Sequence, residues 1–379
     1  MIAPIHPKQI TLLQSYHTMK FTFEVISLQW LASIVLATGA EGFAPSVGQR
    51  QHTAALNMAD DAKSEVEPVY AAKTISSFDR YKKTHAESIR DPAKYWGDLA
   101  RTELDWIKPF DDDKILQGDL TNGDVRWFAG GKLNAAYNAL DRHNPDDLAI
   151  IWEGDEPDDI RKITFGEMLG KVSQIANALK AKGVKKGDVV TIYMPMIPEL
   201  AMTMLACARI GAVHSVVFAG FSAEALASRV KAANCATVVT GDYGMRGGRK
   251  IDLKAIVDNA MDLIEDKELV ENVLVWERGF KEGVTTAEDE VTYEMKEKDV
   301  RMDLLVANQR PFCAPEPMDA EDNLFILYTS GSTGQPKVSS FELCCIAMLA
   351  LCSVFPLNFC RSNAKSYTIC NLCRCIFLQ

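Results

Sequence analysis

From residue 148 onward, short apolar runs alternate with segments whose apolar residues recur every three or four positions. The run at 148–152 predicts a strand, and the apolar positions between 165 and 179 share one face of a helix. Thr164 stands three residues before Glu167, the reciprocal spacing of a capping box, and Gly183 suits a left-handed C-terminal cap. The pattern therefore predicts a strand followed by a helix with both ends defined.

The alternation continues as far as residue 328. Further strands are predicted at 189–194, 212–218, 236–240, 273–276 and 324–328, and helices at 199–210 (ending at Gly211), from a Ser222 cap to Ala233, and at 253–264. The charged segment 281–300 predicts a surface excursion. Buried-type strands that alternate with helices favour an α/β fold, in which a largely parallel sheet with right-handed crossovers is flanked by helices.

Charge and composition narrow the function classes. The 379 residues carry a formal net charge of -10, with 47% hydrophobic and 24% charged residues, which is ordinary for a soluble globular protein. Phosphate-backbone binding needs clustered Lys and Arg, so the balance argues against a general nucleic-acid binder. It leaves room for a small anionic ligand, because a few placed cations suffice for one.

Cysteine use divides the chain at Val338. Only Cys207, Cys235 and Cys313 precede it, whereas seven cysteines lie between Cys344 and Cys375. Three scattered cysteines in a large body predict reduced, buried thiols without a disulfide framework.

The N-terminal residues 1–67 have the pattern of a leader. Met19-Lys20 precedes an apolar run at 25–37 and then small residues, the order of a signal peptide; a buried helix is the alternative, and a membrane span is disfavoured by the short run. The Gly42–Ser46 string and the acid-poor stretch after it resemble the two-part presequences of algae with complex plastids. Plastid or other organelle targeting is predicted, with a cytosolic form starting at Met58 as the alternative.

The strand predicted at 324–328 runs directly into Thr329-Ser-Gly-Ser-Thr-Gly-Gln-Pro-Lys337. Gly331 and Gly334 allow tight turns that present successive N–H groups to an anion, hydroxyls add donors, and Lys337 adds a positive charge. The phosphate-binding residues predicted here are Thr329, Ser330, Gly331, Ser332, Thr333, Gly334 and Lys337. The spacing differs from a Walker loop because Gln335 and Pro336 precede the lysine. A flexible Ser/Gly turn is the alternative interpretation.

This string resembles the phosphate loop of the adenylate-forming superfamily, whose members join a carboxylate to AMP and then pass the acyl group to a thiol. Within it, several segments resemble AMP-forming acetyl-CoA synthetases: 70–110, 127–143, 192–199 and 204–218. The resemblance implies an N-terminal cap at 68–128 and an incomplete AMP-dependent synthetase/ligase domain at 129–337, after a disordered leader at 1–67. The substrates it implies are acetate, ATP with Mg²⁺, and CoA as co-substrate.

A second basic string, Arg246-Gly247-Gly248-Arg249, can close on a phosphate because its glycines admit close backbone approach. A solvated basic turn is the alternative when the string is taken by itself. The family resemblance implies that these four residues contact the phosphorylated nucleotide end of CoA.

Two further residues are assigned to the core. His214 lies between apolar neighbours on a predicted strand, so we expect a hydrogen-bonded core residue and not a catalytic base. Cys207 is expected to pack inside a helix. No metal-ligand spacing occurs before residue 338, and Mg²⁺ would arrive bound to the nucleotide phosphates.

The resemblance ends at Val338, where the family pattern has glycine. Segment 338–379 is interpreted as an aberrant Cys-rich tail from a retained intron or a faulty gene model; a transmembrane run at 343–360 and a metal site at Cys370, Cys373 and Cys375 are the alternatives. The family's adenylation lysine and acyl pocket follow the phosphate loop, so no catalytic residue is assigned. We therefore predict an acetate–CoA ligase sequence whose chain does not catalyse by itself. The alternatives are a non-catalytic nucleotide- or CoA-binding protein, or a propionate-preferring synthetase.

Overall fold

The computed structural model describes residues 78–119, 124–155, 158–278, 293–329 and 337–343. All of these residues belong to the unit Glu67–Gln379, the second of two into which the chain divides. The predicted leader, including Met58, and the part of the tail from residue 344 onward lie outside the described residues.

A seven-stranded sheet forms the centre of the second unit, in the order β12-β11-β8-β6-β7-β14-β15. Its neighbours pair in parallel except β14 and β15, which are antiparallel. This confirms the predicted, largely parallel sheet. The strands are β6 (Val189–Tyr193), β7 (Val213–Val216), β8 (Thr237–Gly241), β11 (Asn272–Trp276), β12 (Asp299–Arg301), β14 (Asn323–Thr329) and β15 (Lys337–Glu342).

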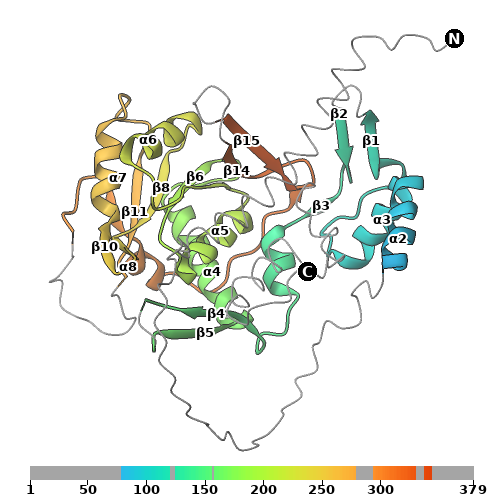
Figure 1. Cartoon of the computed structure of the whole chain (residues 1–379), viewed down its shortest axis with the longest axis horizontal. Helices are drawn as coiled ribbons and strands as arrows, with labels where there is room; N and C mark the ends of the chain where they lie inside the picture. Colours follow the sequence, from blue (N-terminus) through green and yellow to red (C-terminus); the bar gives the residue numbers. More distant parts are fainter. Residues whose placement is uncertain (1–77, 120–123, 156–157, 279–292, 330–336, 344–379) are drawn as a thin grey trace, which may run out of the picture. The chain divides into compact units, whose positions relative to one another are not determined.

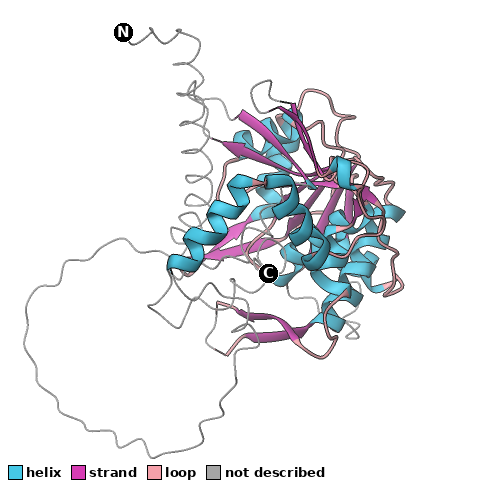
Figure 2. Ribbon diagram, turned by 90° about the vertical axis from the view of Figure 1, so that its right-hand side faces the viewer, coloured by secondary structure: helices cyan, strands magenta, loops and turns pink. Residues whose placement is uncertain are grey.

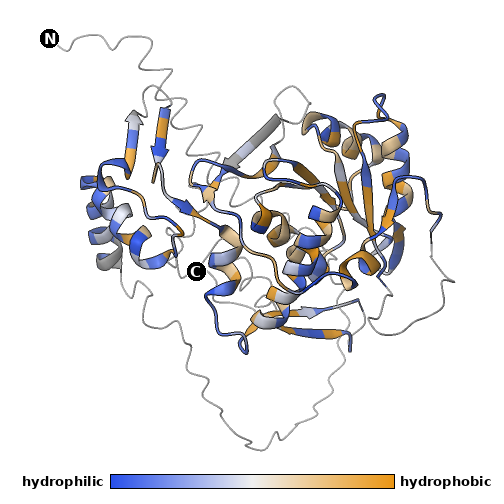
Figure 3. Cartoon of the chain, turned by 180° about the vertical axis from the view of Figure 1, so that it is seen from behind, coloured by the Kyte–Doolittle hydropathy of each residue, from blue (hydrophilic) through white to orange (hydrophobic). Residues whose placement is uncertain are grey.

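Helices pack on both faces of this sheet (Figures 1 and 2). On one face α4 packs against α5 and α8, and on the other α6 packs against α7. Each face has its own core of buried apolar side chains. Figure 3 shows the orange, hydrophobic colour concentrated on the central strands. The helices are α4 (Phe165–Ala181), α5 (Pro198–Ile210), α6 (Ala223–Ala232), α7 (Leu253–Asp262) and α8 (Met302–Ala307).

The predicted helix ends are confirmed. Thr164 and Glu167 form both hydrogen bonds of the capping box at the start of α4. Gly211 ends α5 in the left-handed conformation, with φ 74°, and the Ser222 side chain accepts from the Ala225 N–H at the start of α6. Short-range patterns thus place these helices correctly.

Two further groups of elements surround the sheet. The predicted cap contains helices α2 (Phe78–Arg90) and α3 (Pro92–Glu103), and then the hairpin of β1 (Leu116–Asp119) and β2 (Asp124–Trp127). The rest are β3 (Lys132–Leu133), the π-helix at Tyr137–Asp141, the 3-10 turn at Asp112–Lys114, β4 (Leu148–Glu153), β5 (Ile160–Thr164), β9 (Tyr243–Arg246), β10 (Arg249–Asp252) and β13 (Met318–Asp319). Strands β4 with β5, β9 with β10, and β3 with β13 pair antiparallel.

In the predicted surface excursion at 281–300, the described residues 294–297 are exposed as predicted, whereas the last two residues belong to a strand that was not predicted. This strand is β12, which pairs in parallel with β11 along the sheet. Its charged residues hid this strand from the sequence pattern. Asp299 is buried through an ion pair with Lys254 at 2.7 Å, and the partly exposed Arg301 pairs with Asp303 at 2.7 Å. Residues 281–292 lie outside the described residues.

A second difference concerns the junction at Val338. Strand β15 begins at Lys337 and continues across Val338 to Glu342, paired with β14, and the side chain of Leu343 is buried. The first residues of the predicted tail therefore complete an edge strand of the sheet.

Candidate functional site

The two predicted phosphate-binding strings emerge at the same edge of the sheet. Strand β14 ends at Thr329, and β8 ends at Gly241, just before the β9–β10 hairpin. Because these strands are parallel, their carboxyl ends face the same side, which is where ligands bind in open α/β sheets. Strands β8 and β14 are separated by β6 and β7, so they lie about 14 Å apart at the usual strand spacing.

The phosphate loop is placed by its two flanking strands. Thr329 and Lys337 lie opposite one another in the antiparallel ladder of β14 and β15. The predicted loop residues between them, Ser330, Gly331, Ser332, Thr333 and Gly334, lie outside the described residues. The structure thus fixes where the predicted loop leaves and rejoins the sheet.

The Arg-Gly-Gly-Arg string forms the turn of the β9–β10 hairpin, in which Arg246 pairs with Arg249 across the strands. Gly247 and Gly248 have φ of 56° and 74°, as a two-residue type I′ turn requires. No heavy atom lies within 4 Å of a Cβ placed on either glycine, so the positive φ, and not a lack of space, selects glycine. The turn brings the two arginines to one exposed tip.

Both ends of this hairpin are held by Asp242, which is only 3% exposed. Its carboxylate accepts the N–H groups of Tyr243 (2.7 Å) and Arg278 (3.2 Å). Its backbone carbonyl accepts the N–H groups of Leu253 and Lys254, each at 3.1 Å. One buried residue therefore joins the start of the hairpin, its return and the end of β11.

The hairpin concentrates positive charge. Arg246, Arg249 and Lys250 form no ion pair with a carboxylate among the described residues. The Lys250 ammonium instead lies 4.2 Å from the centroid of the Tyr243 ring. Cations without carboxylate partners keep their charge available for a bound anion, in a chain whose net charge is -10.

Phe218 is a further candidate site residue, which the sequence pattern did not reveal. The side chain is 43% exposed, and the Arg246 guanidinium carbon lies 5.7 Å from its ring centroid. Gly220 permits this approach, because a Cβ there would stand 2.8 Å from the Arg246 Nη1. The apolar run 212–218 predicted a buried strand to its end, whereas β7 ends at Val216, so no signal in the sequence separated Phe218 from the core.

The edge has a topological switch between β6 and β7, whose following helices α5 and α6 lie on opposite faces. At this point the Tyr193 hydroxyl donates to the carbonyl of Phe221 at 2.8 Å. Burial raises the pKa of Tyr193 to about 12, so it stays a protonated donor at neutral pH. The loop after β7 is thereby tied to the end of β6.

The two residues assigned to the core are buried. His214 is 5% exposed and its ring stacks on Phe325 with 5.6 Å between centroids, while burial lowers its pKa to about 4. The expectation of a fully hydrogen-bonded histidine is wrong, because its buried Nδ1 has no partner. Cys207 is completely buried in α5, as predicted, and burial raises its pKa above the usual range. Cys207, Cys235 and Cys313 are free, buried thiols, also as predicted.

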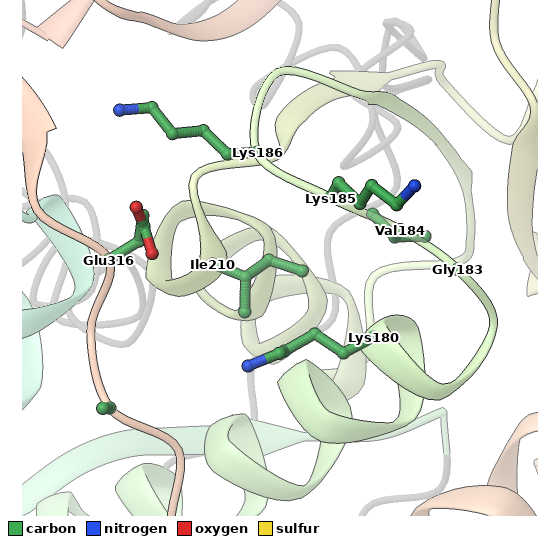
Figure 4. Close-up of a pocket in the computed structure, with 8 residues that line it drawn as sticks. Lys180, Gly183, Val184, Lys185, Lys186, Ile210 and Glu316 are labelled. Atoms are coloured by element: carbon green, nitrogen blue, oxygen red, sulfur yellow. The ribbon is translucent and has the colours of Figure 1, made fainter.

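The described residues contain a cavity of about 280 Å³ at the opposite, amino-terminal edge (Figure 4). Ile210 and Val184 line it together with Lys180 and Glu316, while the side chain of Lys185 points away from Glu316. None of the predicted site residues borders it. Within the same part of the chain, no three His, Cys, Asp or Glu side chains are grouped to hold a metal, and no helix is long and apolar enough to cross a membrane.

Comparison with known proteins shows which family the chain belongs to. The family described as AMP-binding enzyme matches residues 137–339, and a family described as the acetyl-coenzyme A synthetase N-terminus matches residues 81–139. The chain belongs to the AMP-binding enzyme family. Both predicted strings lie inside the AMP-binding match, as does the beginning of β15.

Relatives of this AMP-binding enzyme are named acetyl-coenzyme A synthetases. The protein of Phycomyces blakesleeanus is 52% identical over 268 residues, covering 69% of this chain and 38% of that protein. Acetyl-coenzyme A synthetase 2 of Saccharomyces cerevisiae is 48% identical over 266 residues, covering 69% and 37%. The chain thus spans less than two-fifths of the length of these relatives.

The fold has a counterpart among solved structures. The acetoacetyl-CoA synthetase from Streptomyces lividans superposes with a TM-score of 0.60 at 22% sequence identity, covering 72% of this chain and 39% of that protein. At this identity the likeness establishes the fold alone. It agrees with the parallel sheet and helices described above.

Proposed function

We propose that this chain carries the phosphate loop and the CoA-nucleotide clamp of an acetate–CoA ligase. In that reaction ATP and acetate form acetyl-AMP and pyrophosphate, and the acetyl group then passes to CoA. The observation that carries the proposal is that β14, which leads into the predicted phosphate loop, and β8, which leads into the Arg-Gly-Gly-Arg hairpin, end at the same carboxyl edge of one sheet. The acetyl-coenzyme A synthetase names of relatives about half identical to this chain support the choice of acid.

Each string has a distinct role in this proposal. The loop between Thr329 and Lys337 would hold the triphosphate through backbone N–H groups, and Mg²⁺ would enter with the nucleotide, bound mainly by its phosphates. Arg246 and Arg249 would bind the phosphates at the nucleotide end of CoA. The exposed ring of Phe218 beside Arg246 offers a flat apolar face on which the adenine of CoA could stack.

Binding of CoA to the whole 379-residue protein tests the clamp. A hydrogen bond to a charged group contributes about 1.5–3 kcal/mol, so Arg246→Ala and Arg249→Ala should each weaken CoA binding roughly tenfold or more in isothermal titration. Lys185→Ala is the matched control, since it removes an exposed cation from the opposite edge of the sheet. Equal affinities in all four proteins would refute the clamp.

The reaction itself is tested by release of AMP that depends on acetate and CoA. Turnover by the 379-residue protein would support the ligase and overturn the prediction that segments following the phosphate loop are needed. Binding of CoA and MgATP without turnover would favour the alternative, a non-catalytic binding protein. A higher rate with propionate than with acetate would favour the propionate-preferring alternative.

A further inference from the structure

Arg229, on α6, is held between two aromatic rings. Its guanidinium carbon lies 4.6 Å from the ring centroid of Phe221 and 5.2 Å from that of Tyr328. The side chain is half-buried, and its Nη1 donates to the carbonyl of Ala225 at 2.7 Å. Among the described residues it meets no carboxylate, so the two rings are its main electrostatic partners.

The two rings come from different parts of the candidate site. Phe221 lies in the loop after β7, and Tyr328 directly precedes Thr329, where β14 leads into the phosphate loop. The Tyr328 hydroxyl also donates to the backbone carbonyl of Arg229 at 2.8 Å. Arg229 therefore connects the loop after β7 to the strand that carries the phosphate loop.

From Phe221 the contacts continue to the hairpin. The Phe221 N–H donates to the Phe218 carbonyl at 3.0 Å, and the two rings meet edge to face with centroids 5.8 Å apart. The ring of Phe218 in turn faces the guanidinium of Arg246. An unbroken series of contacts thus runs from Tyr328 through Arg229 and the two phenylalanines to Arg246.

We propose that Arg229 is a positioning residue: by stacking between Phe221 and Tyr328 it sets the position of Phe218, and through it that of Arg246. In this proposal Arg229 acts through Phe221 and Phe218 and not by binding a ligand itself. Its planar guanidinium can face a ring on each side, which the compact ammonium of lysine cannot do equally well. The proposal rests on the proposed function for its ligand, CoA, but the geometry that it asserts exists in the free protein.

The first test needs no ligand. Hydrogen exchange and amide chemical shifts are measured by NMR on the whole protein and on its Arg229→Lys and Phe221→Leu variants. Weakening the stacking of the guanidinium on the rings should make the Phe221 amide exchange roughly two- to fivefold faster and shift the resonances of Phe218 and Arg246. Lys231→Ala, an exposed cation on the same helix, is the control and should leave both unchanged.

The second test compares CoA with dephospho-CoA, which lacks the 3′-phosphate. If Arg229 places Arg246, Arg229→Lys should lower the ratio of the two affinities about threefold or more. A merely structural role would weaken both ligands alike and leave this ratio unchanged. The melting temperature of each variant is recorded to confirm that it is folded.

The outcomes separate the two proposals. Unchanged exchange and shifts at Phe218, Phe221 and Arg246 overturn the positioning role, whatever the ligands do. Faster exchange with an unaltered affinity ratio also overturns it, because the stack would then stabilise the loop without placing Arg246. If the wild-type protein binds CoA and dephospho-CoA equally, the clamp function is wrong, and the exchange data alone decide whether Arg229 orders the loop.

Discussion

Arg209 and Arg229 show two ways in which this fold holds a cation away from solvent. Arg209 lies at the amino-terminal edge of the sheet with a side chain 2% exposed, and its Nη1 and Nη2 bind the two carboxylate oxygens of Asp141 at 2.8 and 3.0 Å. Its Nε donates to the carbonyl of Cys313 at 2.6 Å. Arg229, near the carboxyl edge, has two rings and one helix carbonyl, and no carboxylate among the described residues.

The difference indicates what each region does. Each guanidinium nitrogen of Arg209 donates to an acceptor within the protein, and the buried amide of Asn134 adds hydrogen bonds to the carbonyls of Ala208, Arg209 and Glu316. These contacts join the segment at 134–141 to α5, and the charge of Arg209 is used within the protein. Near Arg229 and Arg246, positive charge is placed over rings and stays uncompensated, which suits the binding of anionic substrates.

Removing Arg209, the cation that is paired with a carboxylate, should have the largest effect on stability. Arg209→Ala removes a buried guanidinium and leaves the partly buried carboxylate of Asp141 unpaired, so we expect the free energy of unfolding to fall by about 2–4 kcal/mol in urea denaturation. Adding Asp141→Leu to it should recover part of this loss, because the uncompensated charge is then gone. A loss below about 1 kcal/mol would show that the pair is replaceable and would remove the contrast with Arg229.

The effect of His214 on stability should be smaller than that of Arg209. His214 is a buried base with neither a carboxylate nor a hydrogen-bond partner for its Nδ1. Its pKa is lowered from 6.5 to about 4 by burial, so the folded protein favours the neutral ring. The stabilisation is complete above pH 6.5 and is lost as the pH falls towards 4, by at most about 3 kcal/mol. His214→Phe should be less sensitive to pH in this window, as measured by urea denaturation at several pH values. Parallel pH profiles would contradict the assignment.

At the β9–β10 hairpin, backbone geometry and not charge pairing should determine how a substitution changes stability and CoA binding. Gly248→Ala forces a side chain into a φ of 74°, which should cost about 1–2 kcal/mol in unfolding free energy and also weaken CoA binding. Gly183→Ala, at a helix end with φ 88°, is the matched control: the same strain without an effect on CoA. If both substitutions weaken CoA equally, the effect comes from global stability and not from the turn.

The smallest effect is expected where an ion pair is only half-buried. Lys186 and Asp322 meet at 2.8 Å with side chains 38% and 30% exposed. Lys186→Met should change the free energy of unfolding by less than about 1 kcal/mol, because water screens the pair. A loss comparable to that of Arg209→Ala would show that burial is not what separates strong from weak pairs in this fold.

The sequence predicted the parts of the protein that local pattern controls. The capping box at Thr164, the left-handed Gly211 and the strand before the phosphate loop follow from residues a few positions apart. Strand β12 was missed, because its charged Asp299 is buried through an ion pair with Lys254, a distant residue, which no periodicity reveals. Phe218 was missed for a similar reason: exposure of an apolar residue depends on what packs over it.

The roles of Asp242 and Arg229 depend on contacts between distant residues. Asp242 binds the N–H of Arg278, 36 residues away, and Arg229 accepts from the hydroxyl of Tyr328, 99 residues away. Neither residue carries a motif. Only the strand order brings the partners of Asp242 and Arg229 to one edge of the sheet. In that order β11 and β8 lie on one side of the β6–β7 pair, and β14 lies on the other.

By itself, the sequence determined the alternation of strands and helices, the helix caps, and the two Gly-containing strings with their positive charges. Backbone propensity and hydrophobic period act over a few residues, so these features are written locally. The tertiary structure decided which strands are neighbours, that the strands leading into both strings end at one carboxyl edge, and which of the described cations remain without carboxylates. Those outcomes depend on burial and long-range pairing, which exist only once the sheet has formed.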